Sequence, residues 1–334
     1  MTSQPSDTTV AIVMATYNGA RFLQEQLDSI ANQTYTDWRL LIRDDGSSDE
    51  TVDIIERAAH ADPRIELIRD NDGNLGPSLN FSALCEIARA RAFDYVFFAD
   101  QDDVWHSDKL AVSLESLQAE ERRTDRTRPI LIHSDLVVID KRGAVLDSSL
   151  MHYKGFHHVD DHPLRVLLVQ NFVTGCSVAC NQALVQLATP VPSVAQMHDY
   201  WYALCAATFG ELAYLPRPTL NYRQHSANNL GARRRTILPS SFHLGPRRAW
   251  QNGITLLEER ITQARELHKM SCQHPNANAD AQKTLDQFLN IFQAPTRGER
   301  LLRASHGHIH CQRGIVYNTL LYLQIFAVPT RRQI

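Results

Sequence analysis

The chain has 334 residues, of which 43% are hydrophobic and 21% charged, and its formal net charge is −3. This length is typical of two domains, or of one large domain with an appendage, and the composition excludes collagen-like, disordered and low-complexity proteins. The charge is divided unevenly, since residues 1–230 contain 19 Lys/Arg and 31 Asp/Glu, whereas residues 231–334 contain 15 and 6. An acidic body with a basic tail argues against a nucleic-acid-binding protein, whose basic face should lie on its folded core.

Cysteine usage and the N-terminus bear on the cellular compartment. The six cysteines include no Cys-x-x-Cys pair, which is typical of reduced thiols in a cytosolic protein. The first nine residues are polar and lack the apolar segment of a secretory signal. No run reaches the ~18 apolar residues of a membrane span. We therefore expect a cytoplasmic protein.

Strand and helix patterns alternate over the first hundred residues. A capping box, Ser47-x-x-Glu50, is expected to open one helix, and helical spacing predicts another over residues 79–92. Short apolar runs predict strands at residues 10–15, 38–42, 65–68 and 95–99. This alternation predicts a parallel sheet of βαβ crossovers, in which ligands bind beyond the carboxyl ends of the strands.

Polar residues follow each of these four strands. The clusters are Thr16-Tyr17-Asn18, Asp44-Asp45-Gly46-Ser47, Asp70-Asn71 and Asp100-Gln101-Asp102-Asp103. Turn formation alone favours Asp and Asn in loops, so a single cluster would carry little weight. Four strand ends that deliver polar residues to one edge of a sheet predict a ligand site at that edge.

The pattern is less regular after residue 130. It predicts strands at residues 130–140, 172–180 and 211–215 and a helix at residues 198–209. The composition changes near residue 231, where we place the boundary between a domain of residues 1–231 and one of residues 232–334. The second domain is expected to be helical, with helical spacing over residues 254–267 and 285–292 and a very apolar run from Ile315 to Val328.

Several common catalytic motifs are absent, and an acidic cluster remains. The sequence has no G-x-G-x-x-G after its first strand, no P-loop, no H-E-x-x-H and no G-x-S-x-G. Asp100, Asp102 and Asp103 lie within four residues, where their charges repel unless a cation neutralises them. Mg²⁺ binds carboxylate oxygens together with substrate phosphates, so this loop predicts a cation that holds a diphosphate.

Seven segments of the chain resemble family 2 glycosyltransferases of the GT-A fold, in the order in which that family has them and over about residues 9–231. The segments are Val10-Ala-Ile-Val-Met-Ala-Thr-Tyr-Asn-Gly, Arg43-Asp-Asp-Gly-Ser-Ser-Asp, Asn74-Leu-Gly-x-x-x-Asn80, Ala99-Asp-Gln-Asp-Asp-Val-Trp105, Thr174-Gly-Cys, His198-Asp-Tyr-Trp and Tyr222-Arg-Gln-His-x-x-Asn228. The resemblance implies a Rossmann-like, mostly parallel sheet flanked by helices, here with a C-terminal helical appendage. The Asp-Gln-Asp-Asp-Val-Trp segment resembles bacterial rhamnosyltransferases of surface-polysaccharide assembly.

The resemblance also implies roles for individual residues. Those expected to bind the nucleotide are Thr16, Tyr17, Asn18, Asp44, Asp45, Asp100, Gln101 and Arg223. Asp45 or Asp44 would contact the base, and Arg223 would pair with phosphate oxygens. The expected ligands of Mg²⁺ or Mn²⁺ are Asp100, Asp102, Asp103 and His225. Asp199, at the start of a predicted helix, matches the catalytic base, which would deprotonate an acceptor hydroxyl.

The implied activity is inverting transfer of a sugar from a nucleotide-diphospho-sugar to a hydroxyl of a saccharide acceptor, either free or lipid-linked. The first expectation for the donor is dTDP-L-rhamnose, and the alternative is a UDP-hexose. Two other classes of function stay open. One is a nucleotidyltransferase that makes sugar nucleotides, although such enzymes usually carry a Gly-rich loop with a basic residue after the first strand. The other is a non-catalytic assembly module that acts through its basic tail.

The basic tail itself has two interpretations. In the first interpretation, the tail forms a helical appendage that packs on the catalytic domain or on a second copy in a homo-oligomer. Alternatively, it attaches peripherally to the inner face of the plasma membrane. In that case Arg233–Arg235 and Arg247-Arg248 would face anionic lipids, and the run from Ile315 to Val328 would lie in the interface.

Overall fold

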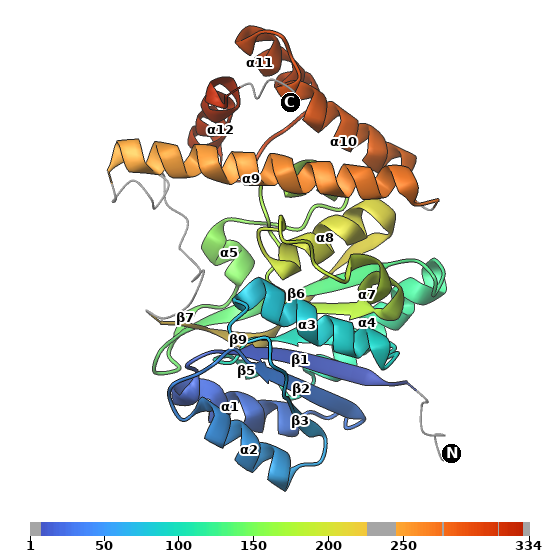
Figure 1. The fold of residues 1–334 in the computed structure, drawn as a ribbon, viewed down its shortest axis with the longest axis vertical. Coiled ribbons are helices and arrows are strands. Elements are labelled where there is room, and N and C mark those ends of the chain that lie inside the picture. The colour runs from blue at the N-terminus through green and yellow to red at the C-terminus, as the bar shows by residue number, and fades with distance from the viewer. Residues whose placement is uncertain (1–7, 226–244, 276, 313, 330–334) are drawn as a thin grey trace.

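The computed structural model describes residues 8–225, 245–275, 277–312 and 314–329, and it contains one sheet with helices on both faces and further helices stacked beyond it (Figure 1). The sheet has the strand order β3-β2-β1-β4-β8-β6-β9-β5, and β7 pairs with β6. The strands are β1 (Val10–Thr16), β2 (Trp38–Asp44), β3 (Ile65–Ile68), β4 (Tyr95–Ala99), β5 (Val104–Trp105), β6 (Ile130–Asp140), β7 (Val145–Asp147), β8 (Val178–Asn181) and β9 (Glu211–Gln224).

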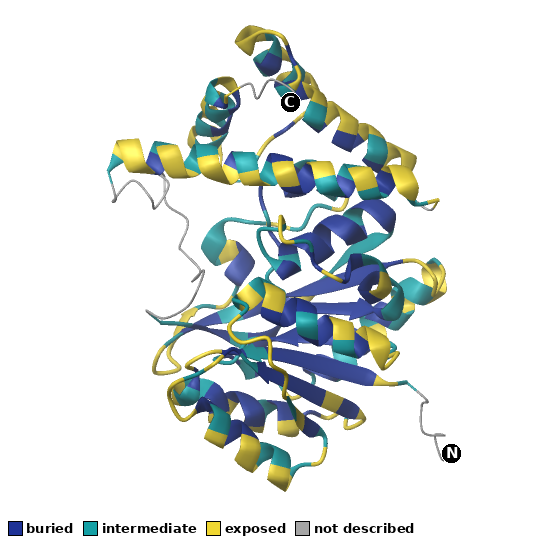
Figure 2. Ribbon diagram, viewed as in Figure 1, coloured by how far each residue is buried: buried dark blue, intermediate teal, exposed yellow. Residues whose placement is uncertain are grey.

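The first four strands form a parallel half of the sheet, as the sequence predicts. β1 lies between β2 and β4, and β2 also pairs with β3. α1 (Ala20–Ala31) and α2 (Thr51–Ala61) pack on the face of β1 that carries Ile12, whereas α3 (Pro77–Ala90) packs on the face that carries Val13. Both faces are therefore buried, which explains the continuously apolar sequence of β1 (Figure 2).

The other half of the sheet is mixed. β8 runs antiparallel to both of its neighbours, β4 and β6, while β6 and β9 are parallel. The strand predicted at residues 172–180 is shorter than expected and shifted, since β8 spans Val178–Asn181 and the three residues before it form a turn of 3-10 helix, Gly175–Ser177. The strand predicted at residues 211–215 continues to Gln224, which brings the end of β9 beside the acidic loop that follows β4.

The start of α2 differs from its prediction. The helix begins at Thr51, and Ser47 and Glu50 do not form a capping box. Instead the backbone N–H and hydroxyl of Ser47 donate to the carboxylate of Asp44 at 2.7 and 2.6 Å, and the backbone N–H of Thr51 donates to Asp49. The capping-box prediction was wrong because Ser47 belongs to the turn that follows β2.

The helices of the central region include one that is buried almost all round. α4 (Lys109–Arg123) packs on the sheet, and α5 (Leu150–Lys154), α6 (Pro163–Leu167) and α7 (Gln182–Ala188) are short. α8 (His198–Phe209) coincides with the predicted helix at residues 198–209. Its sequence is apolar on all sides after Asp199, as expected for a helix enclosed by sheet and neighbouring helices.

Four helices lie among the described residues of the C-terminal part and stack beyond α8 (Figure 1). They are α9 (Pro246–Gln273), α10 (Ala279–Phe292), α11 (Arg297–His306) and α12 (Ile315–Ala327). Leu257 of α9 and Phe288 of α10 belong to the same hydrophobic core as Tyr202 of α8. The helices therefore share a core with the sheet region, and the boundary predicted at residue 231 lies outside the described residues. None of the described helices is both long and apolar enough to span a bilayer.

Candidate active site

A cavity of about 1290 Å³ lies at the carboxyl ends of β1, β2 and β4, where a ligand site is expected in such a sheet. One end is lined by loops after these strands, with Thr16, Tyr17, Asp45, Asp100, Gln101 and Asp102. The middle is lined by Thr174, Gly175, His198 and Asp199. The far wall consists of α9 and α12, including Trp250, Arg260, Tyr317 and Leu321. The cavity thus joins the predicted nucleotide residues to the predicted base.

Two hydrogen bonds join the loop after β1 to the loop after β4. The backbone N–H of Tyr17 donates to Gln101 Oε1 at 2.9 Å, and Gln101 Nε2 donates to the Tyr17 carbonyl at 3.0 Å. A Cβ on Gly19 would stand 2.2 Å from Gln101 Oε1, so only glycine leaves room for the Gln101 amide in this position. Tyr17 keeps 52% of its surface exposed and is one of the residues that line the cavity. This arrangement leaves an aromatic face available to a planar ligand.

Two of the predicted nucleotide-binding residues hold loops instead of lining the cavity. Asp44 accepts hydrogen bonds from the hydroxyls of Thr16 and Ser47 at 2.8 and 2.6 Å. Asn18 has a φ of +46°, its Oδ1 accepts from the backbone N–H of Ser48, and its own backbone N–H donates to Ser47 Oγ. Neither residue is part of the cavity lining. Of the two aspartates predicted to contact a base, Asp45 alone reaches the cavity.

Asp45 is 3% exposed and is held by a buried arginine. Arg43 donates to Asp45 Oδ1 at 3.0 Å and to Asp70 at 2.6 and 2.9 Å. The backbone N–H groups of Leu75 and Gly76 also donate to the Asp45 carboxylate, at 2.7 and 2.8 Å. The Arg43 guanidinium lowers the pKa of Asp70 from its usual value. This network fixes the Asp45 carboxylate at the nucleotide end of the cavity, and nothing in the local sequence pattern predicted the part played by Arg43.

The acidic loop after β4 is held by the end of β9. His225 Nε2 and Asp102 Oδ2 are 2.6 Å apart, and the Arg223 side chain donates to the Asp102 carbonyl at 2.9 Å and to Glu25 at 2.6 Å. Arg223 is 2% exposed and does not line the cavity, so it supports the loop from behind. Its predicted contact with phosphate oxygens stays a prediction.

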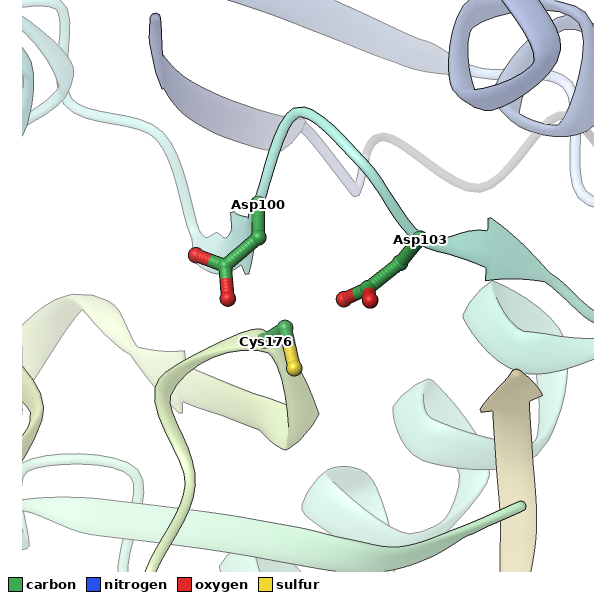
Figure 3. A group of neighbouring side chains, drawn as sticks. All are labelled: Asp100, Asp103 and Cys176. Carbon is green, nitrogen blue, oxygen red and sulfur yellow. The ribbon is translucent and has the colours of Figure 1, made fainter. Parts of the chain in front are cut away.

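Asp100 and Asp103 form a compact group with Cys176, in which one ligand atom from each residue lies within 4.8 Å of the others (Figure 3). Burial, followed by the charges of Asp102 and Asp199, raises the pKa of Asp100 to about 7. Asp103 is fully buried outside the cavity lining, and its Oδ2 has no hydrogen-bond partner among the described residues. An array of carboxylates whose charges oppose one another fits a divalent cation, which prefers oxygen ligands.

The four predicted metal ligands therefore divide into two positions. Asp100 and Asp102 line the cavity, and the imidazole of His225 contacts the Asp102 carboxylate. Asp103 is buried and does not line the cavity. Cys176, from the Thr174-Gly-Cys segment, joins Asp100 and Asp103, although no role for its thiol was expected. Asp100 and Asp102 are the side chains in position to share a cation with a ligand in the cavity.

Asp199 lies at the first turn of α8, with its carboxylate in the cavity lining. Its Oδ1 accepts from the backbone N–H of Tyr200 at 2.7 Å, and its Oδ2 is 3.5 Å from Asn171 Nδ2. Burial raises the pKa of Asp199 to about 6, and these hydrogen bonds and Lys154 oppose the increase. A carboxylate with a pKa near 6 is ionised at neutral pH and is still basic enough to accept a proton from a hydroxyl.

His198 adds a buried ring beside Asp199. It stacks on Phe81 with ring centroids 3.9 Å apart and meets Phe98 edge-on at 5.2 Å. Neither ring nitrogen has a partner among the described residues, and burial lowers the pKa of His198 to about 3, so the ring is neutral. The His198 ring therefore supports the floor of the cavity beneath the start of α8.

The C-terminal helices α9 and α12 line one wall of the cavity, and the sequence patterns did not predict this wall. α9 contributes Trp250, Leu256 and Arg260, and α12 contributes Tyr317 and Leu321. Helical spacing predicted both helices, but spacing carries no information about which distant surface a helix covers. The tail is thus part of the candidate site as well as an appendage.

Comparisons with known proteins agree with this geometry. The family model Glycosyl transferase family 2 matches residues 11–125. The dTDP-rhamnosyl transferase RfbG of Shigella flexneri is 27% identical over 233 residues, which are 66% of this chain and 74% of that protein. The UDP-Glc:alpha-D-GlcNAc-diphosphoundecaprenol beta-1,3-glucosyltransferase WfgD of Escherichia coli is 31% identical over 112 residues, which are 33% of this chain and 42% of that protein.

The fold has solved counterparts. The structure of S. aureus TarS 1–349 in complex with UDP-GlcNAc covers 90% of this chain and 80% of that chain, with a TM-score of 0.55 at 13% identity. The fold is therefore that of the GT-A glycosyltransferases. Residues 11–125 match the family 2 glycosyltransferase model, and the chain resembles rhamnosyltransferases.

Proposed function

We propose that the protein transfers a sugar from a nucleotide-diphospho-sugar to a hydroxyl of a saccharide acceptor, with inversion at the anomeric carbon. The observation that carries this proposal is that Asp199 and the Asp100–Asp102 loop line one cavity, close enough for the charge of Asp199 to act on Asp100. A base and a diphosphate site on the two sides of a bound sugar suit an in-line displacement. RfbG and WfgD, whose names describe sugar transfer, support the same class of reaction and a role in polysaccharide assembly.

In the proposed reaction, the Asp199 carboxylate accepts the proton of the acceptor hydroxyl. The acceptor oxygen forms a bond to the anomeric carbon as the bond from that carbon to the diphosphate oxygen breaks, so a nucleoside diphosphate leaves. Asp100 and Asp102 would hold Mg²⁺ or Mn²⁺, which when bound offsets the charge that develops on the leaving diphosphate. Tyr17 and Asp45 orient the nucleotide, and His225 positions the Asp102 carboxylate.

The donor is expected to be dTDP-L-rhamnose, with a UDP-hexose as the alternative. We expect one of these donors to stabilise the protein against thermal unfolding in Mn²⁺ but not in EDTA, by about 2.7 kcal/mol at a hundred times its Kd. Asp102→Asn should abolish the Mn²⁺-dependent increase, whereas Asp161→Asn, an exposed aspartate outside the cavity, should retain it.

Two results of this titration would contradict the proposal. Stabilisation by nucleoside triphosphates, accompanied by release of pyrophosphate with a sugar 1-phosphate, would instead indicate a nucleotidyltransferase. The absence of stabilisation by any nucleotide sugar in Mn²⁺ would indicate a non-catalytic module that acts through its tail.

Peripheral contact with an anionic membrane is a further part of the proposal. α12 contains no charged residue, and its outer face exposes Ile315 by 86% and Leu323 by 49% beside an apolar groove of about 690 Å³. Arg297 stands over the ring of Phe326, 5.4 Å from its centroid, at the edge of this face. An apolar helix face with a cation beside it suits the surface of an anionic bilayer. Arg233–Arg235 lie outside the described residues.

We expect the protein to sediment with vesicles that contain phosphatidylglycerol and to do so less with pure phosphatidylcholine vesicles. The double variant Ile315→Asp/Leu323→Asp should lose most of this binding, because it places two charges on the apolar face. Val145→Asp, at an exposed apolar residue of the sheet region, is the matched control. Unchanged sedimentation of the double variant would contradict membrane contact, and loss of a dimer in that variant would assign the face to a second copy of the chain.

A further inference from the structure

Side chains of α9 hold the segment that leads into α8. The backbone N–H of Gln196 donates to Gln263 Oε1 at 2.9 Å, and Gln196 Nε2 donates to Glu259 Oε2 at 2.8 Å. The N-cap residue of α8 is Met197, whose thioether side chain makes no capping hydrogen bond. The entry to α8, three residues before Asp199, is therefore fixed by another helix and not by its own N-cap residue.

The residue after Asp199 contacts the same helix. The Arg260 guanidinium lies at the Tyr200 hydroxyl, where it opposes the increase that burial causes in the pKa of Tyr200. This hydroxyl donates to the carbonyl of Leu167, and Tyr200 is 3% exposed. α9 therefore contacts the chain on both sides of Asp199, through Gln196 before it and through Tyr200 after it.

Gln263 is a buried amide on a helix face that is otherwise apolar. It is 1% exposed, and the buried residues next to it on α9 are Ile261, Ala264 and Leu267. Packing alone would be satisfied by an apolar side chain at this position. An apolar side chain would leave the backbone N–H of Gln196 without its acceptor, and a buried donor without a partner is costly. The amide of Gln263 therefore indicates that this particular contact matters.

A second contact of the C-terminal part lies next to Asn171. The backbone N–H of Gln312, just before α12, donates to Gln170 Oε1 at 2.8 Å. The side-chain amide of Gln312 also accepts from the backbone N–H of His157 at 2.9 Å and donates to its carbonyl at 2.8 Å. Asn171 and the backbone N–H of Tyr200 are the two donors described above for the Asp199 carboxylate. The C-terminal helices thus hold the segments that supply both donors.

We propose that Gln263 and Glu259 are positioning residues for the candidate base. Through Gln196 they fix the start of α8, and so the direction in which the Asp199 carboxylate meets the acceptor hydroxyl. The inference rests on the proposed function, which makes Asp199 the base. A base acts only within hydrogen-bond reach of the proton that it accepts, and a displacement of about 1 Å at a catalytic group costs about 10²-fold in rate. The C-terminal helices are thus required for the chemical step itself.

The kinetic test uses the full-length protein and the nucleotide sugar that stabilises it in Mn²⁺. We expect Gln263→Met to lower kcat for nucleoside diphosphate release by about ten- to a hundredfold, while KM and thermal stabilisation by the donor stay unchanged. Glu259→Met should lower kcat less, and Glu259→Gln, which keeps an accepting oxygen, should restore the rate. Glu258→Met is the matched control, because Glu258 is the neighbouring residue and does not line the cavity.

Amide hydrogen exchange tests the same contact without substrate. Gln263→Met should speed exchange about tenfold in peptides that contain residues 196–201 and leave peptides from β1 and β4 unchanged. A role in overall stability alone would instead speed exchange throughout the protein. Because Glu259 is exposed, Glu259→Met carries the test if Gln263→Met is poorly folded, and it should speed exchange in the same peptides.

Three outcomes would overturn the positioning role. These are equal kcat for Glu259→Met and Glu258→Met, a loss of kcat that Glu259→Gln does not restore, and unchanged exchange at residues 196–201 in both Met variants. Failure of the proposed function is distinguishable from these results. An unmodified protein that neither binds nor cleaves a nucleotide sugar would contradict the proposed function, whereas hydrogen exchange would still decide whether α9 holds the segment around Asp199.

Discussion

Replacement of Asp199 by Asn is expected to lower the rate of nucleoside diphosphate release by about 10²–10⁴-fold while donor binding in Mn²⁺ stays intact. The amide keeps the size of the side chain and can still accept from the backbone N–H of Tyr200, but it cannot take a proton from the attacking hydroxyl. The measurement is the initial rate of nucleoside diphosphate release from the donor that stabilises the protein, with water or a saccharide as acceptor.

The pH dependence of the same reaction gives an independent check. The pKa of Asp199 is raised to about 6 by burial, so the carboxylate is protonated and inactive below that pH. We expect kcat/KM to rise tenfold per unit up to about pH 6 and then to level off, and the residual activity of Asp199→Asn to lack this limb. Near-normal turnover of Asp199→Asn, set against Asp161→Asn as control, would show that another group is the base.

Replacement of Arg43 by Met is expected to lower the free energy of unfolding by about 3–5 kcal/mol. Arg43 is 2% exposed and bonds to Asp45, Asp70 and the Asn80 side chain. Its removal leaves the buried carboxylate of Asp45 with two backbone donors and no counter-charge, and an uncompensated buried charge is costly. Urea denaturation followed by circular dichroism measures the change.

The matched control is Arg39→Met on the same strand. Arg39 is exposed and donates to the Pro63 carbonyl, so its loss should change stability by no more than about 1 kcal/mol. The double variant Arg43→Met/Asp45→Asn should recover part of the loss, because it removes the unpaired charge. Equal destabilisation by Arg43→Met and Arg39→Met would contradict the structural role of Arg43.

Much of the fold was predictable because strands buried on both faces leave a strong local signal. The predicted runs at residues 65–68, 95–99 and 130–140 coincide with β3, β4 and β6. Signals were weaker where a segment depends on distant partners. β8 begins only at Val178, where it pairs with β6 and, from Ala179 on, also with β4, and most of β9 is extended because β6 lies beside it. α11 was not predicted, since its short polar sequence resembles a loop.

The candidate site divides in the same way. The sequence by itself determined that polar residues end β1, β2 and β4, since strand periodicity and turn composition are local properties, and it singled out Asp45, Asp100, Asp102 and Asp199. Only the tertiary structure decided which neighbouring residues face the cavity. The Asp44 carboxylate accepts hydrogen bonds from Ser47 in the turn after β2, and Asp103 is buried and does not line the cavity.

The tertiary structure also decided how the cavity is completed. Arg223 and His225 reach the acidic loop from more than a hundred residues away, and α9 and α12 form the wall opposite the nucleotide end. The physical reason is that helical periodicity encodes an apolar face but not its partner, whereas burial, charge pairing and a shared cavity arise only when distant segments pack together.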